Sequence, residues 1–233
     1  MSNADKMIEI PGGGFVRLDA AMADDASVVN AARVSFAKNK VESIELSDVD
    51  KGLINFLMRE RHGTPFEHNA FRFHIKTPVF VAREWFRHRI GSFNEFSARY
   101  SEVPNEFFTP EKKDVRTQVG KPGSYTFEQV DDVLASTATH MIENANEAAY
   151  RTYRGLLAMG VAKEQARVVL PVSMFTQFYW TVNARALMNF LSLRTHETAQ
   201  RDIRQYADAV LELAVPEMPV TFAAWEKHDR QVP

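Results

Sequence analysis

Residues 68–76 alternate between apolar and polar side chains, and this pattern limits the folds open to the chain more than any other stretch. One side of an extended segment would carry Phe71, Phe73 and Ile75, and the other side Arg72, His74 and Lys76. A period of two is typical of a β-strand with one buried face and one polar face. We therefore expect a half-buried strand here, in a chain whose 233 residues suffice for one well-filled core.

Helical spacing precedes this strand. Apolar residues recur at helical intervals over 24–36, and Ser47 with Asp50 three residues later forms the capping signal of a second helix. Pro65 would end any continuation of that helix. We expect two helices before the strand.

The strand is followed by a third helix signal. Thr77 and Pro78 have the order of an N-cap and a first helical residue. The helix would carry Arg87 to Arg89 at its C-terminal end, where cations complement the helix dipole.

The C-terminal half begins with a loop signal and a long helix signal. Residues 102–125 contain three Pro and two Gly and are predicted to form a loop. Thr126 and Gln129 then resemble a capping box for a helix that ends near Met159. Its apolar side would carry Val130, Val133, Leu134 and Met141. At about 1.5 Å per residue this helix spans roughly 50 Å, so we expect it to form a wall or an oligomer surface.

Shorter elements complete the predicted order. They are a helix from Lys163 that stops at Pro171, a strand over Val172 to Thr181, a helix capped by Asn183, and a last helix capped by Thr195 that ends before Pro216. In the helix after Asn183, Arg185 and Asn189 are four residues apart and share a face. Leu187, Phe190 and Leu191 face elsewhere, so the two polar residues are exposed or form part of a site.

Residues 87–101 are unusually dense in hydrogen-bond donors. The cations Arg87, His88 and Arg89 are followed by Ser92, Asn94, Glu95, Ser97 and Arg99. Arginine suits a phosphate or the planar edge of an imide. Neighbouring residues on a helix point about 100° apart, so three such side chains cannot converge on one small anion. The stretch therefore predicts several ligand groups or several subunits, against the plainer alternative of a solvated helix end.

Composition excludes several classes of protein. A formal net charge of -2 argues against a general nucleic-acid binder, which needs a broad basic face. Without a long apolar run or a signal segment, we expect a soluble cytoplasmic protein with no membrane partner. The absence of cysteine excludes disulfides and thiolate metal sites.

Other site patterns are weak. His62, His68 and His74 do not have a recognised ligand spacing, so we predict no metal site. The glycines at 12–14 are isolated from any dinucleotide-binding pattern. Any nucleotide site must then be built from arginines and loop donors.

The chain resembles the flavin-dependent thymidylate synthase family. The resemblance rests on the order R-H-R, seven residues, then Ser97, and on four further blocks. These blocks are A-A-R-V-S-F at 31–36, T-P-F-E-H at 64–68, A-R-V-V-L-P at 166–171 and W-T-V-N-A-R-A-L-M-N-F-L-S-L-R at 180–194. Only the terminal tails and about 105–125 lack a match.

The resemblance implies a single α+β domain over 1–233 with a central antiparallel sheet flanked by long helices. It implies a homotetramer whose active sites are shared between subunits. The implied reaction is reductive methylation of dUMP to dTMP, with 5,10-methylenetetrahydrofolate as one-carbon donor and NADPH-reduced FAD as hydride donor. A chain without cysteine cannot use the thiolate nucleophile of other thymidylate synthases.

The resemblance also implies roles for individual residues. The dUMP-binding positions are Glu84, Trp85, Phe86, Arg87, Glu95, Phe96, Ser97, Ala98, Arg99, Arg167 and Arg194. The FAD-binding positions are Thr64, Arg87, His88, Arg89, Glu95, Asn183, Ala184, Arg185 and Asn189. Arg194 is the implied catalytic residue, because a fixed cation beside uracil N3 lowers the cost of negative charge on the ring.

One alternative belongs to another class of protein. The arginines and aromatic residues of 85–100 could serve a non-catalytic nucleotide- or RNA-binding module. Such a module would bind no flavin, and its RNA affinity would depend steeply on salt.

Overall fold

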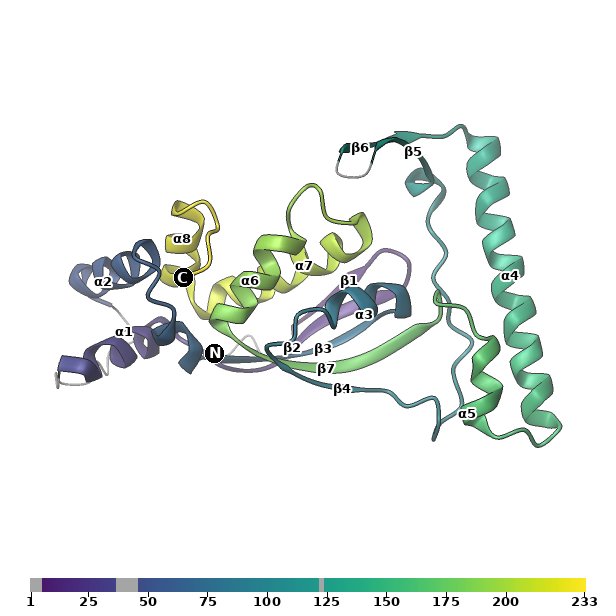
Figure 1. The fold of residues 1–233 in the computed structure, drawn as a ribbon, viewed down its shortest axis with the longest axis horizontal. Helices are drawn as coiled ribbons and strands as arrows, with labels where there is room; N and C mark the ends of the chain where they lie inside the picture. Colours follow the sequence, from purple (N-terminus) through teal and green to yellow (C-terminus); the bar gives the residue numbers. More distant parts are fainter. Residues whose placement is uncertain (1–5, 37–45, 122–123) are drawn as a thin grey trace.

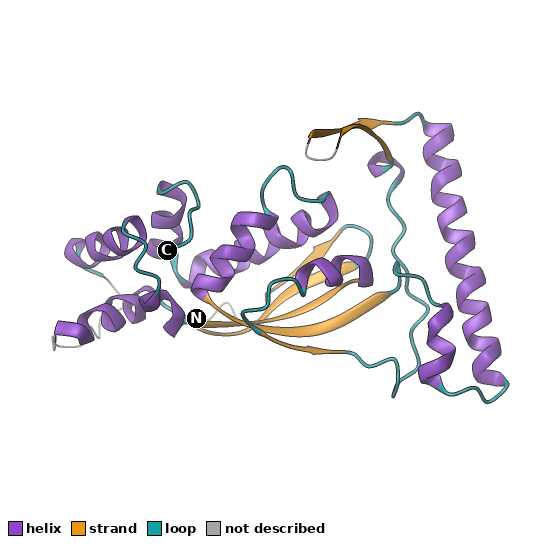
Figure 2. Cartoon of the chain, in the orientation of Figure 1, coloured by secondary structure: helices purple, strands orange, loops and turns teal. Residues whose placement is uncertain are grey.

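A five-stranded antiparallel sheet forms the centre of the molecule. The computed structural model describes residues 6–36, 46–121 and 124–233. In sheet order the strands are β1 (Met7–Ile10), β2 (Gly14–Met22), β3 (Ala70–Pro78), β7 (Phe175–Asn183) and β4 (Ser92–Glu95). Every pairing between neighbours is antiparallel. The helices lie beside and beyond the sheet (Figure 2), which confirms the predicted α+β class.

The sheet has one apolar and one polar face. Phe73 of β3 pairs with Trp180 of β7, and both side chains are fully buried. On the opposite face, Arg72 and Tyr179 are exposed. The apolar face contacts α3 (Val79–Trp85), α6 (Ala184–Arg194) and α7 (Arg201–Ala214), as Figure 1 shows. The predicted alternation is therefore confirmed.

The N-terminal hairpin was not predicted. Gly12 and Gly13 connect β1 to β2 with φ values of 90° and 103°, in the left-handed region that glycine adopts without strain. Gly12 and Gly13 thus lie in the hairpin turn, and Gly14 begins β2. Val16 and Leu18 of β2 are fully buried beneath the helices.

Helices α1 (Asp25–Arg33), α2 (Asp48–Arg59) and α8 (Pro219–Lys227) form one end of the molecule (Figure 1), with the short 3₁₀ turns η1 (Val34–Phe36), η2 (Thr64–His68) and η5 (Val215–Glu217). The predicted capping box is confirmed, because Asp50 N donates to Ser47 Oγ and Ser47 N donates to Asp50 Oδ2. Buried Asp25 ties α1 to α8 by accepting bonds from Val220 N, Thr221 N and Thr221 Oγ1 at 2.6–2.9 Å.

The other end of the molecule corrects two predictions. Strands β5 (Arg116–Lys121) and β6 (Ser124–Gln129) pair with each other in antiparallel fashion, and η3 (Lys112–Asp114) precedes them. The predicted loop is thus partly a strand, although its residues 122–123 lie outside the described ranges. Thr126 lies in β6 and caps no helix.

The long helix α4 (Asp132–Ala158) begins after Asp131, whose side chain accepts a bond from Leu134 N at 2.8 Å. Its buried residues are Ala135, Thr139, Asn146 and Tyr153. The apolar side predicted for this helix is instead exposed in the chain, since Val133, Leu134 and Met141 are 77%, 48% and 68% accessible.

Several boundaries also differ from the prediction. The short helix before Pro171 is confirmed as α5 (Lys163–Ala166) with η4 (Arg167–Val169). Thr77 and Pro78 end β3, so α3 starts one residue after the predicted position. Thr195 is the C-cap of α6, where its hydroxyl donates to Leu191 O, and α7 begins only at Arg201.

Candidate functional site

A cavity of about 490 Å³ lies between the turn after α3 and one face of α6. Its lining residues are Glu67, Arg87, His88, Arg89, Ile90, Asn183, Arg185, Ala186, Asn189, Leu193, Arg194 and Val232. Six of the nine residues predicted to bind FAD are among them. A cavity of this volume with a few convergent polar groups is typical of a small-molecule site.

The prediction placed Arg87 to Arg89 at the C-terminal end of a helix. The structure instead places them after α3, in a turn and the residues that follow it. Helix α3 ends at Trp85, and the backbone then closes on itself as Arg87 N donates to Glu84 O and His88 N donates to Trp85 O. The turn leaves Arg87 and Arg89 exposed and His88 partly buried. All three side chains nonetheless line the same cavity. The expectation that they could not converge on one small anion assumed a helix, and this turn does not test it.

The other wall of the cavity comes from α6. Asn183 caps this helix by accepting a bond from Ala186 N at 2.8 Å, as predicted. Arg185 and Asn189 share the exposed face. The opposite face packs Leu187, Phe190 and Leu191 into the core. Residues of both polar and apolar type thus have the positions that their spacing predicts.

Arg194 is held by two residues of the α3 segment. Its Nε donates to His88 Nε2 at 3.0 Å, and its Nη1 lies 3.2 Å from Glu84 Oε2. Burial, together with the Arg194 charge, lowers the pKa of His88 to about 4, so His88 is neutral and can accept this bond. Burial raises the pKa of Glu84 against the opposing charge of Arg194. The side chain of Arg194 is only 22% exposed, so its charge acts with little screening by water.

Arg185 is fixed by groups that sequence reasoning missed. Its Nη1 pairs with Glu67 Oε1 at 2.6 Å, and its Nε donates to Pro233 O at 2.7 Å. The T-P-F-E-H block contains Glu67 and could have signalled it. The C-terminal tail gave no signal, because an apolar pair such as Val232 and Pro233 carries no chemistry of its own.

A second group of predicted residues lies at the opposite end of the sheet. Glu95 Oε1 accepts a bond from Thr176 Oγ1 at 2.7 Å. Ala98 and Ala166 are buried in one small apolar cluster, and Ser97, Arg99 and Arg167 are their neighbours in the sequence. Ser97 is half-buried, whereas Phe96, Arg99 and Arg167 are exposed. These residues do not line the cavity that contains Arg194.

Three predicted residues belong mainly to the core. Trp85 is fully buried and stacks on Phe190 with ring centroids 4.7 Å apart. Ala184 is fully buried, and Phe86 packs on Phe178 at 5.0 Å. Trp85 and Ala184 can offer a ligand little beyond their backbone atoms.

Thr64 lines a separate, largely apolar cavity of about 860 Å³ with His62 and His68. His74 lies on the polar sheet face between Arg17 and Gln177, so the three histidines do not form one cluster. Across the described ranges, no three His, Cys, Asp or Glu side chains are grouped so that they could hold a metal ion. In the same ranges, no helix is both long and apolar enough to cross a membrane.

The donor set of the first cavity fits a flavin nucleotide. Arg87, Arg89 and Arg185 can pair with phosphate oxygens. Asn183 and Asn189 supply amide groups, and Ile90 and Leu193 supply apolar surface. These lining residues suit an anionic ligand that has a planar, partly apolar part.

Comparisons with known proteins give a consistent family. Residues 17–220 match the family model described as thymidylate synthase complementing protein. The chain is 50% identical over 214 residues to a protein of Thermosipho africanus named flavin-dependent thymidylate synthase, covering 92% of this chain and 91% of that one. A protein of the same name from Tropheryma whipplei is 45% identical over 219 residues, covering 91% of each chain.

A solved structure has the same fold. It is that of PolB from Streptomyces cacaoi, a UMP/dUMP methylase bound with 5-Br dUMP. The TM-score is 0.88 and the sequence identity 41%, over 97% of this chain and 100% of that one.

Proposed function

The chain belongs to the flavin-dependent thymidylate synthase family, and from that premise we propose that it converts dUMP to dTMP by reductive methylation at the cavity between α3 and α6. The observation that carries the proposal is the arrangement of Arg87, Arg89, Arg185 and Asn189 around one cavity beside Arg194. The one-carbon donor is 5,10-methylenetetrahydrofolate, and NADPH is the source of electrons. FAD, when bound, supplies the hydride.

The protein itself contributes binding and electrostatics. The chain has no cysteine, so no thiolate attacks the pyrimidine. Arg194 stabilises negative charge on the uracil ring, because its half-buried guanidinium is screened little by solvent. His88 and Glu84 hold that guanidinium in place.

Residue roles follow this division. Thr64, Arg87, His88, Arg89, Glu95, Asn183, Ala184, Arg185 and Asn189 bind FAD. Glu84 to Arg87, Glu95 to Arg99, Arg167 and Arg194 bind dUMP.

We also propose that the enzyme is a cytoplasmic homotetramer of one-domain subunits with shared active sites. The residues proposed to bind dUMP lie in two places within one chain. Arg194 lines the first cavity, and Ser97, Arg99 and Arg167 lie at the far end of the sheet. This separation supports a site completed by a second copy.

The test is the absorbance spectrum of the purified protein, before and after NADPH, for wild type, Arg185→Ala and Arg83→Ala. Arg83 is an exposed arginine of α3 that does not line the cavity, so its variant is the matched control. We expect flavin bands in wild type and control that bleach with NADPH, and weaker FAD retention in Arg185→Ala. A colourless protein that FAD does not titrate, with salt-dependent RNA binding, would indicate the alternative module.

A further inference from the structure

The C-terminal tail reaches the cavity although it lies beyond the matched family segment. The family match ends at residue 220. After α8 the chain turns back toward α6, Val232 lines the cavity, and Pro233 O accepts the bond from Arg185 Nε. The tail thus touches a proposed flavin-binding residue.

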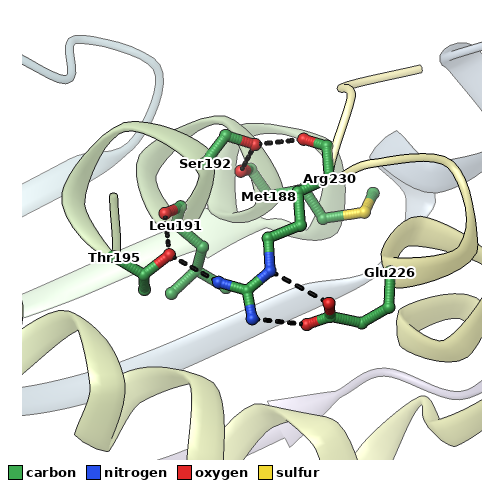
Figure 3. A network of polar contacts seen from close by, with 6 residues as sticks. All are labelled: Met188, Leu191, Ser192, Thr195, Glu226 and Arg230. Atoms are coloured by element: carbon green, nitrogen blue, oxygen red, sulfur yellow. Dashed lines mark hydrogen bonds and ion pairs between the residues drawn. The ribbon is translucent and has the colours of Figure 1, made fainter. Parts of the chain in front are cut away.

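Arg230 anchors this tail to α6 and α8 (Figure 3). Its Nη1 donates to Thr195 Oγ1 at 2.8 Å, and its Nε and Nη2 lie 3.0 and 2.8 Å from the two carboxylate oxygens of Glu226. Its own backbone oxygen accepts a bond from Ser192 Oγ at 2.5 Å. The guanidinium also lies over the ring of Trp225, at 5.3 Å from the centroid. The guanidinium and the backbone oxygen of Arg230 are therefore both bonded to residues of α6, its C-cap or α8.

The backbone at this anchor is held in an unfavourable conformation. Asp229 and Arg230 have φ values of 54° and 55°, in the left-handed region that costs a non-glycine residue free energy. Two consecutive residues of this kind persist only when surrounding contacts fix them. The contacts of Arg230 supply that restraint and set the direction in which the tail leaves α8.

The free end of the tail is fixed at the cavity by two further features. Arg61 Nη2 donates to Gln231 Oε1. Gly63 lies against the tail, since a Cβ at this position would collide with the Arg185 guanidinium and with Pro233 O. The absence of a side chain at Gly63 is what allows Arg185 and Pro233 to meet.

These contacts determine how Arg185 is presented. One N–H of Nη1 is bound to Glu67 and the N–H of Nε to Pro233, so the donors left to a ligand are both N–H groups of Nη2 and the second one of Nη1. Because the guanidinium is planar, two fixed nitrogens define the direction of the third. A fixed donor loses less side-chain entropy when a ligand binds.

We propose that segment Arg230–Pro233 is part of the flavin site and that Arg230 is a positioning residue, which acts by holding Pro233 O against Arg185 so that the guanidinium is aligned with an acceptor oxygen of FAD. The inference rests on the proposed function of the same cavity. It adds to that site a segment outside the matched family residues.

The test compares Arg230→Met, Arg230→Lys and the matched control Lys227→Met in the full chain, by fluorescence titration with FAD. Methionine keeps an apolar stem over Trp225 but removes the guanidinium. Lys227 is an exposed cation at the end of α8, the helix that contains Trp225. We expect the FAD dissociation constant to rise about tenfold in Arg230→Met, the effect of one lost charge-assisted bond. Arg230→Lys should recover part of the loss, and Lys227→Met should match wild type.

The affinity for dUMP, measured with FAD saturating, should stay within about twofold of wild type. The reason is that the contacts of Arg230 do not include Arg194 or its partners His88 and Glu84. If Arg230→Met does not unfold cooperatively, Arg61→Met replaces it and should weaken FAD binding by releasing Gln231. Unchanged or tighter FAD binding in the variants, with wild type binding FAD normally, overturns the positioning role alone. A wild type that binds no FAD instead overturns the proposed function.

Discussion

Arg194 combines a low exposure with two fixed partners, and its chemistry can be separated from flavin binding by substitution. Arg194→Ala should lower thymidylate formation by roughly 10²–10³, on the order of the loss of one oxyanion-hole donor. FAD content should remain, since the cavity keeps its other cations. Arg194→Lys should rescue little, because lysine lacks the planar fork that meets Glu84 and His88 together. Normal thymidylate formation by Arg194→Ala would remove this residue from the mechanism.

His88 makes the stability of the fold depend on pH. Its pKa is about 4 in the folded chain and 6.5 ordinarily, so between these values the unfolded chain binds more protons. The contribution of neutral His88 is therefore fully present above pH 6.5 and is lost as the pH falls toward 4. His88→Phe, which keeps a ring against Phe190, should flatten this dependence. Urea unfolding at pH 7, 6 and 5 measures it, and parallel curves for the two proteins would contradict it.

The sequence predicted those site residues whose side-chain type alone indicates a binding role. Arg87 to Arg89 were found because the stretch is dense in donors, and Arg185 and Asn189 because residues four apart share a helix face. Pro233 could not be found, since its contribution is a backbone oxygen placed by Arg230. The family resemblance supplied the roles, and the spacing supplied only the positions.

Among the elements, α4 differs most from the sequence prediction. A long helix was predicted here, but its start was placed too early. Thr126 and Gln129 have the residue types of a capping box, yet their backbone pairs with strand β5. Local propensity cannot distinguish these two outcomes, because pairing with β5 decides between them. The hairpin of β1 and β2 was also missed, since β1 is only four residues long and the glycines gave an ambiguous signal.

The exposed apolar side of α4 carries a prediction about assembly. Leu134 and Met141 are seven residues apart, hence on one face, and are 48% and 68% exposed. If this face contacts another copy, Leu134→Glu with Met141→Glu should give a smaller particle by light scattering. His140→Glu with Arg151→Glu, at exposed positions about 100° around the same helix, should not. An unchanged mass in both double variants would exclude α4 from the interface.

The whole molecule is extended, with α1, α2 and α8 at one end and α4 and α5 at the other (Figure 1). The first cavity lies beside α6, whereas Ala98 and Ala166, the sequence neighbours of Ser97 and Arg167, share a cluster with Tyr153 of α4. The buried face of β3 followed from the alternation over 68–76, and the antiparallel sheet followed from the family resemblance. How the two groups meet did not follow from one chain, because it depends on contacts between copies. The cysteine-free composition is the property of the whole chain that most restricts its chemistry.

The central claim is that this chain makes thymidylate with a flavin and without an enzyme thiolate. The most direct measurement is anaerobic incubation of the purified protein with dUMP, 5,10-methylenetetrahydrofolate, NADPH and FAD, followed by chromatographic quantification of dTMP. We expect catalytic turnover that requires each of the four components and is insensitive to thiol-alkylating reagents. Absence of dTMP from a folded protein that holds FAD and dUMP would contradict it, as would dTMP formation that does not depend on flavin.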